Sequence, residues 1–351
     1  MLAIFMSPLS SPDRYAPLGF PPAEPISTLR SVAHLFGSSK SRCGIYLLEF
    51  TGERFYIGQA VDVVRRFGQH RKNYDDISGF SFIPTQRGSL DQIERDLIQK
   101  AELLSLLILN TVHASNVFGE TDLDMVLSQE EQAEWLSSPV RFNKGDTAAP
   151  IALPAAQLER FSKQFHRLKE HPLYTSASEL LTTYVHHCIP APKRTEYSFW
   201  VVSCLPATNR NTWPRLLCVS AGVMELLVLG YHKDAPSTLW GFVTVASDVL
   251  SGTFKTDKSF MDFFPSTEII RRQYRDAGQH QVTLWAADEQ SFAAILRHKA
   301  VQQAAAALAL RVMRKRATIY SKFHCKHVAN HAIGTNLSVS RAPALQAPAT
   351  G

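Results

Sequence analysis

Short apolar and alternating runs fall into two groups along the chain, and each group predicts an antiparallel sheet. In the first group, CGIYLLEF (43–50) and RFYIG (54–58) flank a short turn, which predicts a β-hairpin. GFSFIP (79–84) alternates and contains aromatic and branched residues, so it predicts a third strand that its proline ends. A small three-stranded antiparallel sheet is therefore expected.

Two helices are expected beside this sheet. The first should run from about Val61 to Lys72. The second should begin near Leu90, because Ser89 and Gln92 have the spacing of a capping box, whose two side chains satisfy backbone donors of the first turn. Apolar residues then recur at helical spacing. Residues 41–115 are thus predicted to form a small α+β domain.

The second group of apolar runs follows an acidic stretch. Residues 116–157 are expected to form an acidic helix and then a linker rich in Pro, Gly and Ala. The strand-like runs beyond them are YSFWVVSCL, RLLCVSA, MELLVLGYH, WGFVTVA and HQVTLWA. Asp288 then precedes an Ala-rich run that predicts a long helix to about Arg316. Residues 158–331 are therefore predicted to form a larger α+β domain with an antiparallel sheet.

The two ends of the chain differ from these domains in composition. Residues 1–40 contain many Pro, Ser and Ala residues, which predicts a loosely ordered arm. Residues 332–351 are expected to form a flexible tail. The predicted fold class is α+β, with two separate domains between these ends.

Composition narrows the class of protein. Of 351 residues, 45% are hydrophobic and 19% are charged, which excludes a wholly disordered chain. No run approaches the roughly 20 apolar residues of a spanning helix, and MLAIFMSPLSSP lacks the basic flank of a secretory signal. The five cysteines form no C-x-x-C pair, which suits a reducing compartment. We therefore expect a soluble, cytoplasmic protein without a membrane partner.

The formal charge of +6 is distributed unevenly. It is +1 over residues 1–115, −5 over 116–150, +3 over 151–286 and +7 over 287–351. A basic end favours contact with a polyanion, although solvated helix faces produce the same asymmetry. Basic residues that interleave with aromatic ones make up the candidate nucleic-acid-binding surface: Arg314, Lys315, Arg316, Lys322 and Lys326. Cations that complement a helix dipole explain the arginines equally well.

A cluster of histidines near the C-terminus has two interpretations. His327 and His331 stand four residues apart, a spacing that can hold zinc on a helix, with His324 or Cys325 as a third ligand. No obvious fourth ligand stands nearby. Exposed basic residues near the end of the chain are the alternative interpretation.

Three side chains of the first domain are candidates for catalysis or metal binding. Glu94 shares a helix face with apolar residues, so its carboxylate needs a partner, either another charged side chain or a metal ion. A hard cation such as Mg²⁺ binds through one or two carboxylates together with water and substrate phosphate. Arg66 and His70 stand four residues apart on a predicted helix and so share a direction; alone, they would suit a solvated helix face.

These residues belong to a longer pattern. In order along the chain stand Gly44-Ile45-Tyr46, Tyr56-Ile57-Gly58, Arg66, His70, Glu94 and Asn110. The pattern resembles the GIY-YIG nuclease family over about residues 41–115 and leaves the second domain outside the resemblance. Gln59 follows the second tripeptide where the family's DNA-repair branch generally has lysine, so that branch is not indicated.

The resemblance implies a role for each residue of the pattern. Glu94 would hold a single Mg²⁺ or Mn²⁺ ion, and Arg66 would stabilise charge on the scissile phosphate. Tyr46 would be the general base or would orient the attacking water, with Tyr56 and His70 supporting it. Asn110 would brace the site or the substrate backbone, and Gly58 would allow a close backbone approach.

Two functions are therefore open at this point. The first is a metal-dependent endonuclease that acts on DNA, whose C-terminal domain selects a target or a protein partner. The alternative is a catalytically silent module that binds nucleic acid or protein on a nuclease scaffold. The retained tyrosines, Arg66, His70 and Glu94 favour the first function.

Overall fold

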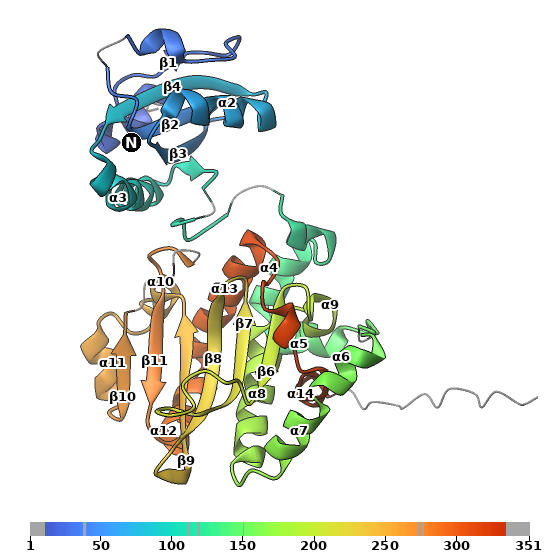
Figure 1. Ribbon diagram of the computed structural model, residues 1–351. Coiled ribbons are helices and arrows are strands. Elements are labelled where there is room, and N and C mark those ends of the chain that lie inside the picture. Colours follow the sequence, from blue (N-terminus) through green and yellow to red (C-terminus); the bar gives the residue numbers. More distant parts are fainter. Residues whose placement is uncertain are drawn as a thin grey trace, which may run out of the picture.

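The computed structural model describes residues 11–37, 40–110, 112–117, 120–149, 151–271, 274 and 277–334. Its fold is α+β and contains two sheets, one formed early in the chain and one formed late (Figure 1). The predicted α+β class with antiparallel strands is confirmed at this level. In the described part of the chain, no helix has both the length and the apolar character needed to cross a membrane.

The small sheet has five strands in the order β1-β4-β2-β3-β5. Its strands are β1 (Glu24–Pro25), β2 (Gly44–Phe50), β3 (Arg54–Ala60), β4 (Ile77–Pro84) and β5 (Leu107–Ile108). β2 pairs antiparallel with both β3 and β4, as the sequence predicts. The other two strands were missed, because each contains only two residues. β5 pairs in parallel with β3, so the sheet is mixed rather than purely antiparallel.

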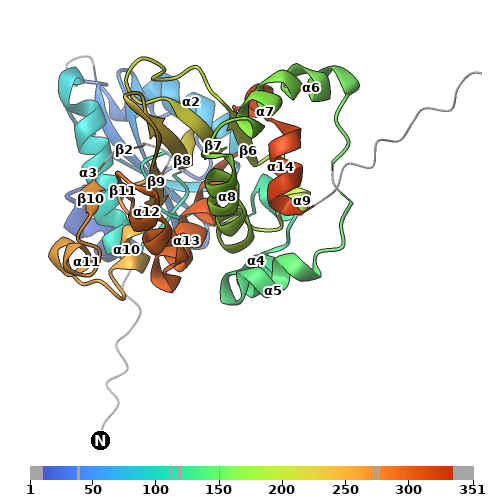
Figure 2. The same ribbon diagram turned by 90° about the horizontal axis from the view of Figure 1, so that it is seen from below.

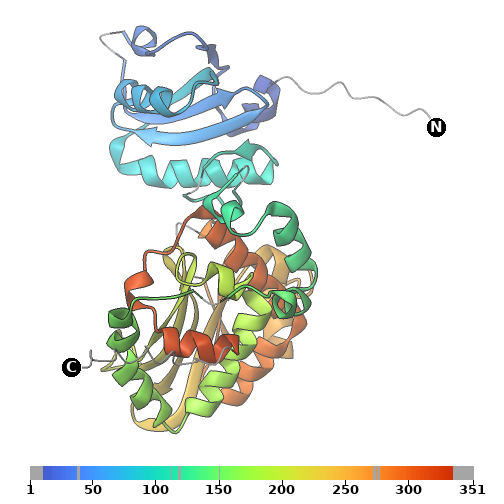
Figure 3. The same cartoon turned by 90° about the vertical axis from the view of Figure 1, so that its right-hand side faces the viewer.

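Helices α2 (Val63–Asn73) and α3 (Leu90–Leu103) pack on opposite faces of the small sheet (Figure 3). The side chain of Asp62 caps α2 by accepting a hydrogen bond from the Arg65 N–H at 3.2 Å. The predicted capping box at Ser89 is wrong. Ser89 makes no side-chain cap, because the 3-10 turn η3 (Arg87–Ser89) leads directly into α3.

The predicted loose arm is wrong for residues 11–37. These residues form α1 (Ser11–Tyr15), η1 (Ala16–Leu18), β1 and η2 (Ala33–Leu35). Tyr15 and Phe20 are buried on the α3 side of the sheet, and Ile26 and Val32 are buried on the α2 side. The arm therefore contributes to both cores. Residues 1–10 of the arm and 335–351 of the predicted tail lie outside the described residues.

The large sheet has six strands in the order β10-β11-β9-β8-β7-β6, all paired antiparallel. Its strands are β6 (Trp200–Cys204), β7 (Arg215–Ala221), β8 (Met224–His232), β9 (Ala235–Val245), β10 (Thr267–Ile270) and β11 (Val282–Ala286). Five of them are the strands predicted from the sequence. β10 was missed, because four residues give too short a pattern to recognise.

The main hydrophobic core lies between the large sheet and a layer of helices. Figure 2 shows α8 (Tyr174–Cys188), α12 (Glu289–Arg297) and α13 (Lys299–Lys315) together on one side of the sheet. On β9, Val243 and Val245 face this core, whereas Trp240 and Phe242 lie on the opposite face. The single long helix predicted after Asp288 is divided, because His298 is extended between α12 and α13.

Shorter helices surround this arrangement. They are α6 (Ala155–Arg160), α7 (Ser162–Lys169), α9 (Pro192–Thr195), α10 (Ser247–Leu250), α11 (Asp257–Phe263), η6 (Ser321–Phe323) and α14 (Lys326–Ile333). The backbone N–H of Cys325 donates to the Val202 carbonyl at 2.8 Å, so the segment between η6 and α14 covers the outer edge of β6. That edge strand is therefore protected from pairing with another chain.

The acidic segment packs onto the helical layer, contrary to the predicted linker. It forms η4 (Asp122–Met125), α4 (Gln129–Ser137) and α5 (Pro139–Gly145). Leu123, Leu127 and Trp135 are fully buried in the main core. Residues 121–145 therefore fold together with the large sheet.

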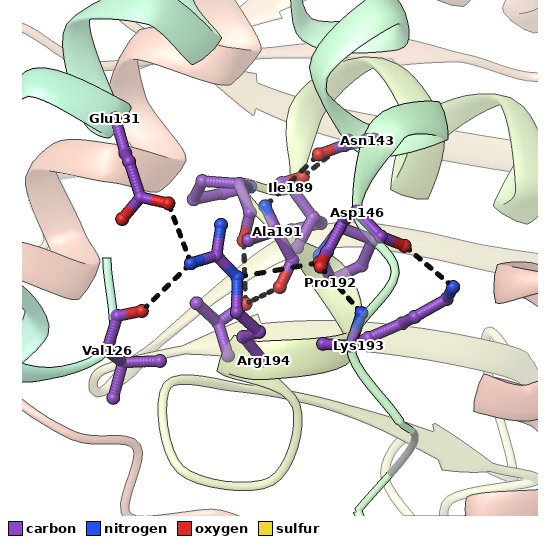
Figure 4. Close-up of polar contacts among 12 residues, drawn as sticks. Val126, Glu131, Asn143, Asp146, Ile189, Ala191, Pro192, Lys193 and Arg194 are labelled. Carbon is purple, nitrogen blue, oxygen red and sulfur yellow. Dashed lines mark hydrogen bonds and ion pairs between the residues drawn. The ribbon is translucent and has the colours of Figure 1, made fainter. Parts of the chain in front are cut away.

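Polar contacts fix the same segment in place (Figure 4). Arg194 on α9 donates to Glu131 Oε1 at 2.9 Å and to the Val126 carbonyl at 3.3 Å. Asn143 accepts from the Ala191 N–H at 3.1 Å and donates to the Ile189 carbonyl at 2.9 Å. Part of the segment's negative charge is thus compensated within the fold.

A buried charged cluster joins α14 to the segment before β6. Glu196 is fully buried and accepts from Lys326 Nζ through one carboxylate oxygen. Its other oxygen lies 2.9 Å from His324 Nε2, while His324 Nδ1 accepts from the Val202 N–H at 3.3 Å. Each group has its hydrogen-bond partner, so this cluster stabilises the fold.

We expect Glu196→Gln to lower the free energy of unfolding by about 3–5 kcal/mol, because the substitution leaves Lys326 buried without its counter-charge. Urea unfolding of the full chain measures this effect. Glu179→Gln, at an exposed position of α8, is the matched control and should change stability little. Equal stability of the two variants would contradict the structural role of the cluster.

Candidate active site

The hairpin of β2 and β3 places Tyr46 and Tyr56 on one face of the small sheet. Tyr46 lies directly opposite Gly58, and Leu48 lies opposite Tyr56. The two tyrosine rings stack with their centroids 6.1 Å apart. Alternation along each strand therefore directs both tyrosines of the sequence motif toward α2.

Glycine is required at two positions of the motif. A Cβ on Gly58 would overlap the phenol of Tyr46, which lies across the β3 backbone. A Cβ on Gly44 would overlap the Ile83 carbonyl and the ring of Phe82. The motif glycines thus leave room for neighbouring groups. Ile45 and Ile57, the middle residues of the two tripeptides, are fully buried on the α3 side.

Helix α2 brings Arg66 and His70 to the Tyr46 hydroxyl. His70 Nε2 lies 2.7 Å from Tyr46 Oη, and Arg66 Nε donates to the same oxygen at 3.4 Å. The Tyr46 hydroxyl can donate its proton to His70 Nε2 when the neutral ring carries its own proton on Nδ1. Arg66 is exposed, so its guanidinium is also accessible to a ligand.

Burial determines the protonation of this group. It lowers the pKa of His70 to about 4, with the Arg66 charge adding to the effect. Burial also raises the pKa of Tyr46, and the neighbouring Tyr56 raises it further. Both side chains are therefore neutral at pH 7, which leaves one ring nitrogen of His70 free of a proton and able to accept.

Glu94 approaches from the other side of the sheet. β5 pairs with β3 only at Arg54 and Phe55, so the second half of β3 is not covered by β5. At this edge Gln59 Nε2 donates to Glu94 Oε2 at 2.9 Å and also to Asp91. Burial raises the pKa of Glu94, and the Asp91 charge adds to it, while the Gln59 hydrogen bond and Arg66 oppose the shift.

Two of these residues were not selected from the sequence. Gln59 directly follows the second tripeptide, and its side chain holds the Asp91 and Glu94 carboxylates together. Asp91 stands three residues before Glu94 on α3, on the same helix face. That spacing was a signal that could have identified Asp91.

Asn110 supports β3 beside the site. Its side chain is buried, accepts from the Ile57 N–H at 3.0 Å and donates to the Ile57 carbonyl at 2.6 Å. The Asn110 side-chain amide thus makes the two backbone hydrogen bonds at Ile57, the residue before Gly58, that a neighbouring strand would otherwise make. Of the two roles open in the sequence, the structure shows the bracing contact.

The basic residues near the C-terminus do not form one exposed surface. Lys326 is buried against Glu196, and Arg314 donates to Asp124 Oδ1 at 3.0 Å. Lys315 donates to the Ala114 carbonyl. Arg316 and Lys322 are exposed. The predicted nucleic-acid surface is therefore wrong in its inclusion of Lys326 and Arg314, which make contacts inside the fold.

The candidate zinc ligands are also directed apart. His324 contacts Glu196, and the Cys325 thiol forms a hydrogen bond with Cys204. His327 Nε2 lies 3.1 Å from the Leu158 carbonyl, and the His331 ring lies 5.9 Å from that of Tyr174. Within the described residues, no three His, Cys, Asp or Glu side chains form a group that could hold a metal ion.

No family model, curated protein or solved structure matches the chain. The candidate site therefore rests on the residues and contacts of this chain.

The pH dependence of stability tests the burial of His70. Its pKa is about 6.5 in an unfolded chain and about 4 here, so folding favours the neutral ring. The resulting stability is fully present above pH ~6.5 and is lost as pH falls toward 4, by about 2–3 kcal/mol. Urea unfolding across this range should show a smaller loss in His70→Gln than in the native chain.

His34→Gln is the control for this measurement, because His34 is exposed on η2. It should leave the curve of stability against pH unchanged. The same acid sensitivity in His70→Gln as in the native chain would show that His70 is not the responsible group.

Proposed function

We propose that this chain is a metal-dependent endonuclease that hydrolyses phosphodiester bonds in DNA at the site on the small sheet. The observation that carries the proposal is that Glu94 on α3 interacts electrostatically with Tyr46 on β2 and with Arg66 on α2, although it approaches β3 from the opposite side of the sheet. Hydrolysis of a phosphodiester needs a cationic donor, a ligand for a divalent ion and a group that orients water. The resemblance to the GIY-YIG family supports the same assignment.

Glu94 and Asp91 fit the requirements of a single Mg²⁺ or Mn²⁺ ion. The raised pKa of Glu94 reflects burial beside a second carboxylate, and Gln59 offers this pair only a neutral donor. When bound, the ion would supply positive charge to the phosphate oxygens. Arg66 would contact the phosphate from the α2 side, because its guanidinium is exposed.

Tyr46 and His70 together offer a path for one proton. The attacking water would give a proton to Tyr46 Oη as the phenol passes its own proton to His70 Nε2, which lies 2.7 Å away. The new oxygen–phosphorus bond forms as the bond to the leaving oxygen breaks, and the leaving oxygen takes a proton from solvent. Tyr56, stacked on Tyr46, would hold the phenol in place.

The organisation of the chain follows from this assignment. We propose that residues 41–115 are a catalytic domain of the GIY-YIG type and that the part built on the large sheet selects the DNA target or a protein partner. All five cysteines are free thiols, which supports a cytoplasmic location.

A catalytically silent module for binding nucleic acid or protein is the second candidate. The raised pKa of Tyr46 favours it, because a phenol that keeps its proton at neutral pH is a poor base. The two candidates differ in a measurable property, which is metal-dependent cleavage of DNA.

Glu94→Gln should abolish Mg²⁺- or Mn²⁺-dependent cleavage of plasmid, branched and single-stranded DNA, with a loss on the order of 10²-fold or more, because the ion loses its charged ligand. The fold should remain, since glutamine still bonds Gln59. Asp96→Asn, at an exposed position of the same helix, is the control. Unchanged cutting by Glu94→Gln at equal protein concentration would reject the site.

Arg66→Ala should slow cleavage at least on the order of 10²-fold, as loss of one preorganised charge-stabilising donor does. Arg65→Ala removes the adjacent arginine, which is exposed on the same helix, and should retain native activity. Single-turnover rates compare the two variants. Equal cleavage rates for the two variants would show that Arg66 is a surface residue that does not contribute to the site.

A further inference from the structure

A cavity of about 540 Å³ opens on the face of the large sheet opposite α8, α12 and α13. Strands β6, β7 and β8 form its floor, and α6, α7, η6 and the loop after β6 form its walls. Its volume is in the range of ~300–1,000 Å³ that holds small ligands. It lies outside the candidate active site.

The floor contains a buried cation whose hydrogen bonds are incomplete. Arg215 is only 8% exposed, and both of its terminal nitrogens bond the Glu225 carboxylate. Its Nε has no hydrogen-bond partner among the described residues. That nitrogen is itself enclosed, so it is the rest of the Arg215–Glu225 pair that lines the cavity and offers a ligand both N–H donors and a carboxylate acceptor. Ser220 and Glu225 add a hydroxyl and an acceptor beside it.

Aromatic side chains line the walls and lie next to cations. Phe323 is 44% exposed, and the Lys322 Nζ lies 5.0 Å from the centre of its ring. The Arg160 guanidinium lies 5.3 Å from the centre of the Phe161 ring. Arg210 is also exposed at the cavity. Planar rings beside cations are the surface on which unpaired nucleotides stack and their phosphates bind.

We propose that this cavity binds one nucleotide whose base is unstacked from its neighbours. The base lies against Phe323 and Phe161, its polar edge bonds Arg215 and Glu225 on the floor, and its phosphate contacts Arg160 and Arg210 at the opening. The choice of a nucleotide rests on the proposed nuclease function, and the cavity would then hold a strand of the substrate apart from the cleavage site.

Binding of a labelled single-stranded DNA to the full chain, measured by fluorescence anisotropy without divalent metal, tests the proposal. Phe323→Ala should weaken binding by about 5- to 150-fold, the effect of removing one stacking partner. Phe263→Ala, a 61% exposed phenylalanine on α11 outside the cavity, is the matched control and should bind as the native chain does. Equal affinities of native chain and Phe323→Ala would overturn the proposal.

A second pair of variants tests the phosphate contact. Arg160→Gln should weaken binding and reduce its salt dependence, because one phosphate contact is lost. Arg297→Gln, at an exposed position of α12, controls for the loss of one positive charge. Equal salt dependence in the two variants would overturn the assignment of the phosphate to Arg160.

Two probes distinguish the source of the nucleotide. A strand of the same length without bases should bind more weakly than the intact strand, and equal binding would overturn the base pocket. Calorimetry with each deoxynucleoside monophosphate tests a free nucleotide, and Phe323-dependent binding of the monophosphate alone would support the cavity with a free ligand. Because none of these measurements requires cleavage, inactivity of the Tyr46 site would reject the nuclease proposal without deciding this one.

Discussion

The candidate site depends on one close contact, between the Tyr46 phenol and the β3 backbone at Gly58. The hairpin register sets these residues opposite one another, and a Cβ at position 58 would occupy the space of the phenol. With the space free, the ring lies across β3 and its hydroxyl reaches Arg66 and His70 on α2. Asn110 holds the same strand one residue earlier. The position of the phenol thus follows from backbone pairing.

Several of the charged side chains that make the chain's charge uneven pair with one another inside the fold. The acidic segment and the basic C-terminal helix are opposite in sign, and Arg314 joins them through Asp124. Arg311 likewise bonds Asp248 through both of its terminal nitrogens, at 2.7 and 2.8 Å. A count of charges along the sequence treats such residues as available to a polyanion. Folding instead satisfies several of them, so net charge overestimates the surface that can hold DNA.

Local patterns were sufficient to predict the three central strands of the small sheet and five strands of the large one, because their alternation is long enough to recognise. They were insufficient for β1, β5 and β10, which are too short to show alternation, and β1 and β5 are in addition fixed by pairing with distant residues. The same limit applies to the candidate site. Spacing placed Arg66 with His70 on one helix face, but the bridge from Gln59 to Glu94 joins a strand to a helix across 35 positions. The burial of Lys326 against Glu196 spans 130 positions and left no local signal.

Buried polar and charged groups have different roles in different parts of this molecule. Around Glu196 every charged group has a partner, and the cluster is closed, which is the pattern of a structural network. Among the described residues the Tyr184 hydroxyl has no partner, but it is enclosed in the main core, so no ligand could reach it. Arg215 differs from Tyr184 because its side chain and that of its partner Glu225 line a cavity that opens to solvent. Glu94 satisfies a related condition at the edge of β3, where burial and Asp91 leave its charge poorly compensated. Charged side chains at an accessible position, rather than buried charge itself, therefore distinguish the two candidate binding sites from the polar groups that only stabilise the fold.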